Sequence, residues 1–197
     1  MNIKQVLNRL KPAVAMTVLT HPDPRLSQKC DEVNIECAVE MVEVAQLIED
    51  LVVTMRKESG AGLAAAQVGV SKRVFVYDIS DGEGSPDSLD DLSGKSKDGN
   101  AAALINPIIT FLSEEVIEDE EGCLSFPALY APVKRSQKVV VSGYNQAGEA
   151  VTVEAEDFLA RVFQHEIDHL DGVTFVTRLP EEGKMHALRE YFDLHSG

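Results

Sequence analysis

The chain has 197 residues, 44% of them hydrophobic, so a single globular domain with a substantial core is expected. Its 18 basic and 33 acidic residues give a formal net charge of −15, which argues against nucleic acid as a partner, and no apolar run is long enough to cross a membrane. The three cysteines are too few and too unevenly numbered for a disulfide framework, which favours a reducing, cytoplasmic location.

Residues 1–17 form a candidate N-terminal arm. Its first 15 residues lack acids and carry Lys4, Arg9 and Lys11, as an organellar targeting segment would. The stretch is short and poor in serine, so we favour an amphipathic arm that lies on the domain.

The first half of the chain predicts one helix and one strand. Apolar residues recur at three- and four-residue steps over 38–58, which is typical of an amphipathic helix, and Gly60 and Gly62 end it. Residues 73–79 alternate and are rich in β-branched and aromatic types, which predicts a strand. Residues 80–100 are rich in glycine, serine and acids, and are predicted to form a mobile loop.

The second half predicts more strands and two helices. Residues 104–112 are strand-like, with Pro107 expected at an edge or a bulge. Residues 138–144 and 150–154 flank a turn sequence and predict a hairpin. Helices are predicted over 157–170, ending near Gly172, and over 181–194.

The segment His165-Glu166-Ile167-Asp168-His169 has the pattern H-E-x-x-H. On a helix the two histidines lie about 40° apart on one face, so both imidazoles can bind one metal ion, with Glu166 beside them to move protons. The alternative is a pair of surface histidines. The apolar flanks predict a buried helix instead, and buried imidazoles need partners.

A catalytic metal usually has three protein ligands, and the third must come from elsewhere in the chain. Cys123 is attractive because Gly122 allows a close backbone approach and a thiolate suits Fe²⁺, Zn²⁺, Co²⁺ or Ni²⁺. The spacing leaves other ligands open, namely His21, His186, His195, the acids and the remaining cysteines. For Cys30 and Cys37 we predict the role of small buried hydrophobes.

Residues 60–67 (GAGLAAAQ) combine small residues with a terminal glutamine. Their backbone can approach a ligand closely, and the Gln67 amide could donate a hydrogen bond to an oxyanion. A simple packing contact with a surface glutamine is the alternative. A phosphate-binding loop is disfavoured, because no Lys-Ser or Lys-Thr follows the second glycine.

Three segments together resemble the peptide deformylase family: GAGLAAAQ from Gly60, EGCLS from Glu121 and QHEIDHL from Gln164, in the family's order. Residues 19–26 (LTHPDPRL) and 104–107 (LINP) add to the resemblance, which covers roughly 18–179. The expected fold is α+β, with antiparallel β-sheets around a central metal-binding helix, an N-terminal helix and a C-terminal helix. Residues 1–197 would form a single catalytic domain.

The resemblance implies a hydrolase that removes the formyl group from the N-terminal formyl-methionine of new polypeptides. Cys123, His165 and His169 would bind one divalent metal ion, Fe²⁺ in the cell and Zn²⁺, Ni²⁺ or Co²⁺ in purified protein. Hydroxide on the metal would attack the formyl carbonyl with Glu166 as general acid and base. The Gln67 side chain and the Leu124 backbone N–H would hold the oxyanion.

The nascent formyl-methionyl peptide is the implied partner, bound as an added strand near Gly62. Phe158 and Val162 are candidates for the methionine pocket, with plain core positions as the alternative. Asp168 is expected to orient the metal site, with Arg135 as a candidate partner, rather than to be a solvated carboxylate.

The chain departs from the family at Tyr130, where many bacterial members carry an arginine near the peptide cleft, and in its longer 80–100 loop. A transient ribosome contact is also implied, but the short C-terminal segment has few of the basic residues that some members use for it. Two alternative functions stay open, a related metal-dependent amide hydrolase or peptidase with a different acyl specificity, and a catalytically inactive metal-binding homologue.

Overall fold

The computed structural model describes residues 10–78 and 101–195, so the whole of the predicted 80–100 loop and the first nine residues of the arm lie outside the described residues. The ordered elements are, in chain order, η1 (Pro24–Ser27), α2 (Ala38–Lys57), β1 (Gly62–Ala64), η2 (Ala65–Val68), β2 (Val74–Asp78), β3 (Ala101–Leu112), β4 (Val116–Cys123), β5 (Phe126–Ser136), β6 (Lys138–Tyr144), β7 (Ala150–Glu156), α3 (Asp157–Leu170), η4 (Phe175–Arg178) and α4 (Glu181–His195).

The described strands form two antiparallel sheets, as the α+β prediction expects. One sheet has five strands in the order β1-β2-β3-β6-β7, and the other is the β4–β5 hairpin. Among the described strands β1 is therefore an edge strand, and none of them pairs with its outer side, where another extended segment can bind. This edge borders the candidate site.

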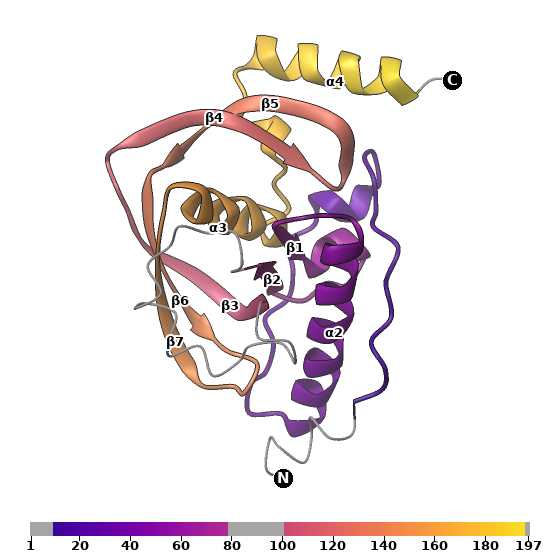
Figure 1. Cartoon of the computed structure of the whole chain (residues 1–197), viewed down its shortest axis with the longest axis vertical. Coiled ribbons are helices and arrows are strands. Elements are labelled where there is room, and N and C mark those ends of the chain that lie inside the picture. Colours follow the sequence, from indigo (N-terminus) through magenta and orange to yellow (C-terminus); the bar gives the residue numbers. More distant parts are fainter. Residues whose placement is uncertain (1–9, 79–100, 196–197) are drawn as a thin grey trace.

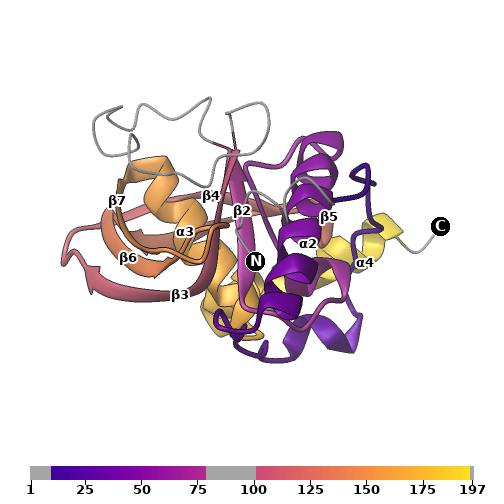
Figure 2. The same cartoon turned by 90° about the horizontal axis from the view of Figure 1, so that it is seen from below.

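α2 and α3 cover opposite faces of the five-stranded sheet (Figure 2). The alternation of side chains along β2 produces this arrangement: Val74 and Val76 join the cluster that contains α2, whereas Phe75 and Tyr77 join the cluster that contains α3. All four are fully buried, since both faces of the strand are covered. The sequence of β2 is consequently almost continuously hydrophobic.

α3 lies between the large sheet and the β4–β5 hairpin (Figure 1). One side of the helix is apolar, and residues such as Phe163 and Ile167 join the sheet's core. The other side is polar and meets the hairpin, where the Gln164 side chain exchanges hydrogen bonds with both backbone groups of Ser136. A third cluster packs the outer face of the hairpin against η4 and α4. The histidine pattern is thus buried between two layers.

Most of the predicted elements are confirmed, including the helices over 38–58, 157–170 and 181–194, the strand over 104–112 and the 138–154 hairpin. The strand predicted over 73–79 is found at Val74–Asp78, and its last residue lies outside the described residues. Pro107 lies in a bulge of the central strand β3, not at an edge of the sheet. Gly172 has φ +73, and a Cβ there would meet the Ser27 backbone at 2.8 Å, so this turn requires glycine. β1, η2, β4 and β5 are not predicted from the sequence.

Residues 10–17 of the arm lie along α2, as expected of an arm that covers the domain (Figure 1). Cys30 is buried as predicted, but the prediction for Cys37 is wrong, because Cys37 occupies the half-buried N-cap position of α2. Within the described residues, no helix is both long and apolar enough to span a membrane.

Candidate metal centre and active site

Cys123, His165 and His169 converge at one point. Their potential ligand atoms all lie within 4.8 Å of one another, and Cys123 Sγ is 3.2 Å from His169 Nε2. The helical spacing places both histidines on one side of α3, and the rings meet edge to face at 4.9 Å. Cys123 comes from the end of β4, where a register shift after Gly122 turns the strand.

The electrostatics of this cluster favour a thiolate. Burial opposes ionisation of the Cys123 thiol, but the neighbouring imidazoles, His169 first among them, more than offset it, so the pKa of Cys123 lies well below its usual value. Burial likewise opposes a charge on His165, but Cys123 and Glu121 raise its pKa well above the usual value. A cluster that draws the thiol toward its ionised form presents the ligand state that metals bind.

The donor set fits a divalent metal ion. One sulfur and two imidazoles are the ligands of catalytic zinc and related transition-metal sites. Among the described residues, the buried atoms Glu166 Oε2 and His169 Nδ1 have no hydrogen-bond partner, which is unusual for polar atoms removed from water. The unpaired carboxylate oxygen lies beside the donor set, where a ligand or water can use it.

Glu166 is held close to the start of β1. Its carboxylate passes Gly62 so closely that a Cβ on Gly62 would lie 2.6 Å from Glu166 Oε1, well inside van der Waals contact. The missing side chain of Gly62 therefore makes room for Glu166. Burial raises the pKa of Glu166 to about 7, against the opposing effect of the two imidazoles.

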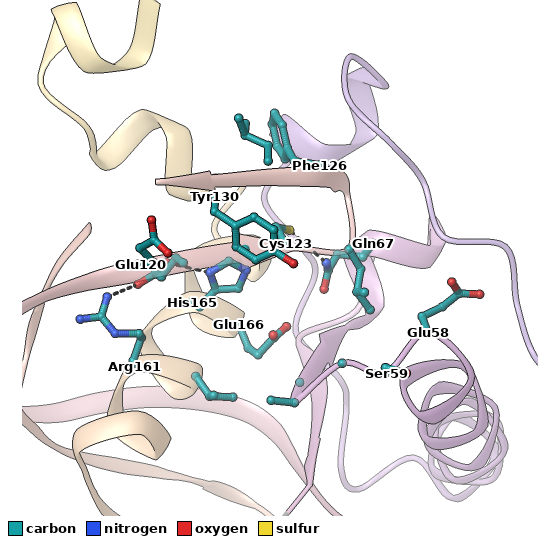
Figure 3. A pocket seen from close by; sticks show the side chains of 18 of the residues that line it. Glu58, Ser59, Gln67, Glu120, Cys123, Phe126, Tyr130, Arg161, His165 and Glu166 are labelled. Atoms are coloured by element: carbon teal, nitrogen blue, oxygen red, sulfur yellow. Dashed lines mark hydrogen bonds and ion pairs between the residues drawn. The ribbon is translucent and has the colours of Figure 1, made fainter. Parts of the chain in front are cut away.

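Gln67 lies across the cluster from α3, on η2 (Figure 3). Its Oε1 accepts a hydrogen bond from the Ala64 backbone N–H at 2.8 Å, which turns Nε2 toward Cys123 Sγ at 3.5 Å and Ser125 Oγ at 3.4 Å. Gln67 is almost fully buried, so the surface-glutamine alternative is wrong. Leu124, the other predicted oxyanion residue, follows Cys123, and both Gln67 and Leu124 line a cavity that opens beside the cluster.

Glu121 orients His165 from the side opposite the thiolate. Its Oε2 lies 2.9 Å from His165 Nδ1, which leaves Nε2 of that ring to face the cluster. Arg135 and Arg161 both donate to Glu121 at 2.8 Å. Burial opposes ionisation of Glu121, but His165 and Arg135 outweigh it and hold its pKa far below the usual value. The imidazole is thus fixed by a carboxylate that stays charged.

Asp168 extends this network, and its predicted pairing with Arg135 is confirmed, because Arg135 Nη1 lies 2.6 Å from Asp168 Oδ2. Arg178, on η4, also donates to Asp168. Asp168 is buried and is not a solvated carboxylate at a helix end.

Glu121 and Arg161 belong to the site, although neither is predicted there from the sequence. Arg161 precedes His165 by one helical turn, so a shared face of α3 was a usable signal, and it brings both side chains to Glu121. No periodic pattern in the sequence indicates the role of Glu121, because its partners lie on other elements, β5 and α3.

A cavity of about 590 Å³ opens beside the cluster (Figure 3). Gly62, Phe158 and Val162, the three predicted substrate contacts, all line it, with Phe158 exposed and Val162 buried. Tyr130 lies over Gly122 at the opening, where a Cβ on Gly122 would meet the Tyr130 ring at 2.6 Å. Cys123, His165, Glu166 and Gln67 also line the cavity, so the cluster is accessible to a ligand.

Comparison with known proteins agrees with this geometry. The family model described as polypeptide deformylase matches residues 15–185. A peptide deformylase of Acidothermus cellulolyticus is 47% identical over 151 residues, which cover 75% of this chain and 73% of that protein. A peptide deformylase of Desulforudis audaxviator is 41% identical and covers 82% of this chain and 91% of its own.

Solved structures show the same likeness. The crystal structure of peptide deformylase from Ehrlichia chaffeensis has a TM-score of 0.76 and 32% identity, and the match covers 92% of this chain and 97% of that chain. A second structure of that protein, in complex with actinonin, also has a TM-score of 0.76. The family is metal-dependent, and its members are hydrolases of protein biosynthesis. Matches of this extent and identity place the chain in the peptide deformylase family.

Proposed function

We propose that this chain releases formate from the N-terminal formyl-methionine of newly made polypeptides by metal-dependent hydrolysis. The observation that carries the proposal is the meeting of Cys123, His165 and His169 around one point, beside the unpaired Glu166 carboxylate oxygen, in a cavity open to a peptide.

Cys123, His165 and His169 would hold the metal ion, with Fe²⁺ as the proposed ion in the cell and Zn²⁺, Ni²⁺ or Co²⁺ able to replace it. A divalent ion of this kind supplies Lewis-acid chemistry, since it polarises an amide carbonyl and lowers the pKa of water. Glu121 would keep His165 in the tautomer that presents Nε2, and Asp168 and Arg135 would keep Glu121 in place.

Glu166 would move the protons. A pKa near 7 matches a group that must accept a proton from water and then deliver it to the departing amine at neutral pH. Its unpaired oxygen can accept a hydrogen bond from water, and Gly62 allows it to stay in that position.

Gln67 Nε2 and the Leu124 backbone N–H would stabilise the negative charge that develops on the formyl oxygen. The Ala64 N–H that binds Gln67 Oε1 fixes which end of the amide points into the site, so the donor needs no reorientation during the reaction. Loss of such a donor typically costs about 2.7–4 kcal/mol of transition-state stabilisation.

The peptide backbone would pair with the free edge of β1 near Gly62, in the manner of an added strand. Phe158 and Val162 would contact the methionine side chain from α3. Because the Ehrlichia chaffeensis relative binds actinonin, we propose that the same compound occupies this cavity and competes with the peptide.

The decisive experiment is anaerobic formate release from formyl-Met-Ala-Ser by the Fe²⁺-loaded protein, combined with metal analysis. We expect turnover in the wild type, and in Glu166→Ala a retained metal with turnover reduced by a factor of at least about 100. Removal of the metal by a chelator should abolish turnover, and added Fe²⁺ should restore it.

The outcomes also separate the alternatives. Cleavage of an internal peptide without formate release would favour a related peptidase. A metal-loaded wild type as inactive as Glu166→Ala would favour a homologue that has lost catalysis.

A further inference from the structure

The extended N-terminal segment at residues 11–21 connects the surface of α2 to both sides of the active site. Along its first part, the backbone N–H groups of Lys11, Val14 and Met16 donate to side chains of α2 at 2.8–2.9 Å. The three acceptors, Gln46, Asp50 and Thr54, are spaced by four residues and therefore form one row along the helix.

The second part of the segment reaches the site itself. The Leu19 N–H donates to the Gln67 backbone carbonyl at 2.7 Å, and the His21 N–H donates to the Ser125 backbone carbonyl at 2.9 Å. Amides two residues apart in an extended chain point the same way and lie about 6.6 Å apart. The same short stretch thus binds Gln67, which bears one proposed oxyanion donor, and Ser125, which follows Leu124, the residue that bears the other.

The far end of the segment is also fixed. The His21 ring stacks on Phe126 at a centroid distance of 4.8 Å, and Tyr191 Oη donates to the His21 carbonyl at 3.0 Å. The segment is therefore anchored on α2 at one end and on β5 and α4 at the other. The hydrogen bonds of Leu19 and His21 to the site lie between these anchors, so contacts on both sides fix the position of these two residues.

We propose that residues 11–21 act as a positioning clip, which sets the separation between Gln67 on η2 and Leu124 on the turn after β4. The inference rests on the proposed function, because it assumes that these two groups hold the oxyanion. η2 is a helical turn that follows strand β1 of the five-stranded sheet, whereas Leu124 lies in the turn of the separate β4–β5 hairpin, so strand pairing does not fix their relative position. Oxyanion donors must be aligned to fractions of an ångström, and misplacement by about 1 Å can cost about 100-fold in rate.

The first test removes contacts that hold residues 11–21 on α2, away from the proposed catalytic residues. Asp50→Ala combined with Thr54→Val removes two of the acceptors on α2 in the full-length, metal-loaded protein. We expect kcat to fall by about 3- to 30-fold while KM changes by less than about twofold, because the donors act on the transition state. The matched control is Glu43→Ala, which removes an exposed carboxylate from the same helix and should leave kcat unchanged.

The same double substitution in a Gln67→Ala background separates positioning from general loosening. Without the Gln67 donor, the clip no longer has two oxyanion donors to align. In the Gln67→Ala protein, the double substitution should therefore lower kcat by less than about twofold. An amide-to-ester replacement between Val18 and Leu19 provides an independent variant, since it removes the N–H that donates to the Gln67 carbonyl without changing any side chain. It should reproduce the fall in kcat without loss of bound metal.

An active wild type whose clip variants keep its kcat would refute the inference and leave the proposed function intact. An equal loss of kcat with and without Gln67 would also refute it, because the effect would then be a general structural one. A wild type that releases no formate refutes the proposed function, and the inference with it.

Discussion

Gly62→Ala provides a sharp test of the Glu166 assignment. The new Cβ would lie 2.6 Å from Glu166 Oε1 and 2.9 Å from its Cδ and Cγ, although non-bonded carbon atoms normally stay about 3.5–4.0 Å apart. The carboxylate must therefore move by about 1 Å. The backbone at Gly62 is compatible with alanine, since its φ is not in the left-handed range, and its N–H and carbonyl remain available for the peptide.

A displacement of this size at a catalytic group can cost about 100-fold, so we expect kcat to fall by about 10- to 100-fold while bound metal is retained. The assay is anaerobic formate release, with metal content measured on the same sample. Gly183→Ala is the matched control, because its Cβ would meet nothing closer than 3.7 Å. If Gly62→Ala turned over at the wild-type rate, the position of Glu166 would not matter and its assigned role would be wrong.

Three further predictions concern stability and the support of the metal ligands. Glu121→Gln should weaken metal binding by about 10- to 100-fold in a metal titration, and should lower the free energy of unfolding by about 3–5 kcal/mol in urea. Arg161 loses its buried counter-charge in this variant, and Arg135 keeps only Asp168. Wild-type values in both measurements would contradict this. The folded-state pKa of Glu121 lies below its ordinary value of 4.5, so its stabilisation is complete above pH 4.5 and is lost as pH falls toward the folded-state pKa. The unfolding free energy of the wild type should therefore fall more steeply below pH 4.5 than that of Glu121→Gln, and parallel curves would refute the linkage. Leu51→Ala should cost about 2–5 kcal/mol in the same urea assay without changing bound metal, because Leu51 is fully buried against the sheet on the side away from the metal centre.

The helices and most of the sheet could be predicted from the order of the residues, because their signals are local. The apolar spacing over 38–58, the alternation over 73–79 and the turn at 145–148 each depend on neighbours a few residues away. The histidine pair and its glutamate could also be predicted from the sequence, since His165 and His169 are one helical turn apart and Glu166 follows His165 directly. β5 was missed, although its burial alternates, and β1 is too short for a periodic signal.

The tertiary structure alone decided which residues meet across the chain. Cys123 lies 46 positions from His169, and no periodicity links them, so the sequence alone is compatible with several third ligands. The packing of the end of β4 near α3 selects Cys123. The charged network around Glu121 and the approach of Gly62 to Glu166 have the same origin. Secondary structure follows from short-range geometry, whereas a site assembled from different layers depends on how those layers pack.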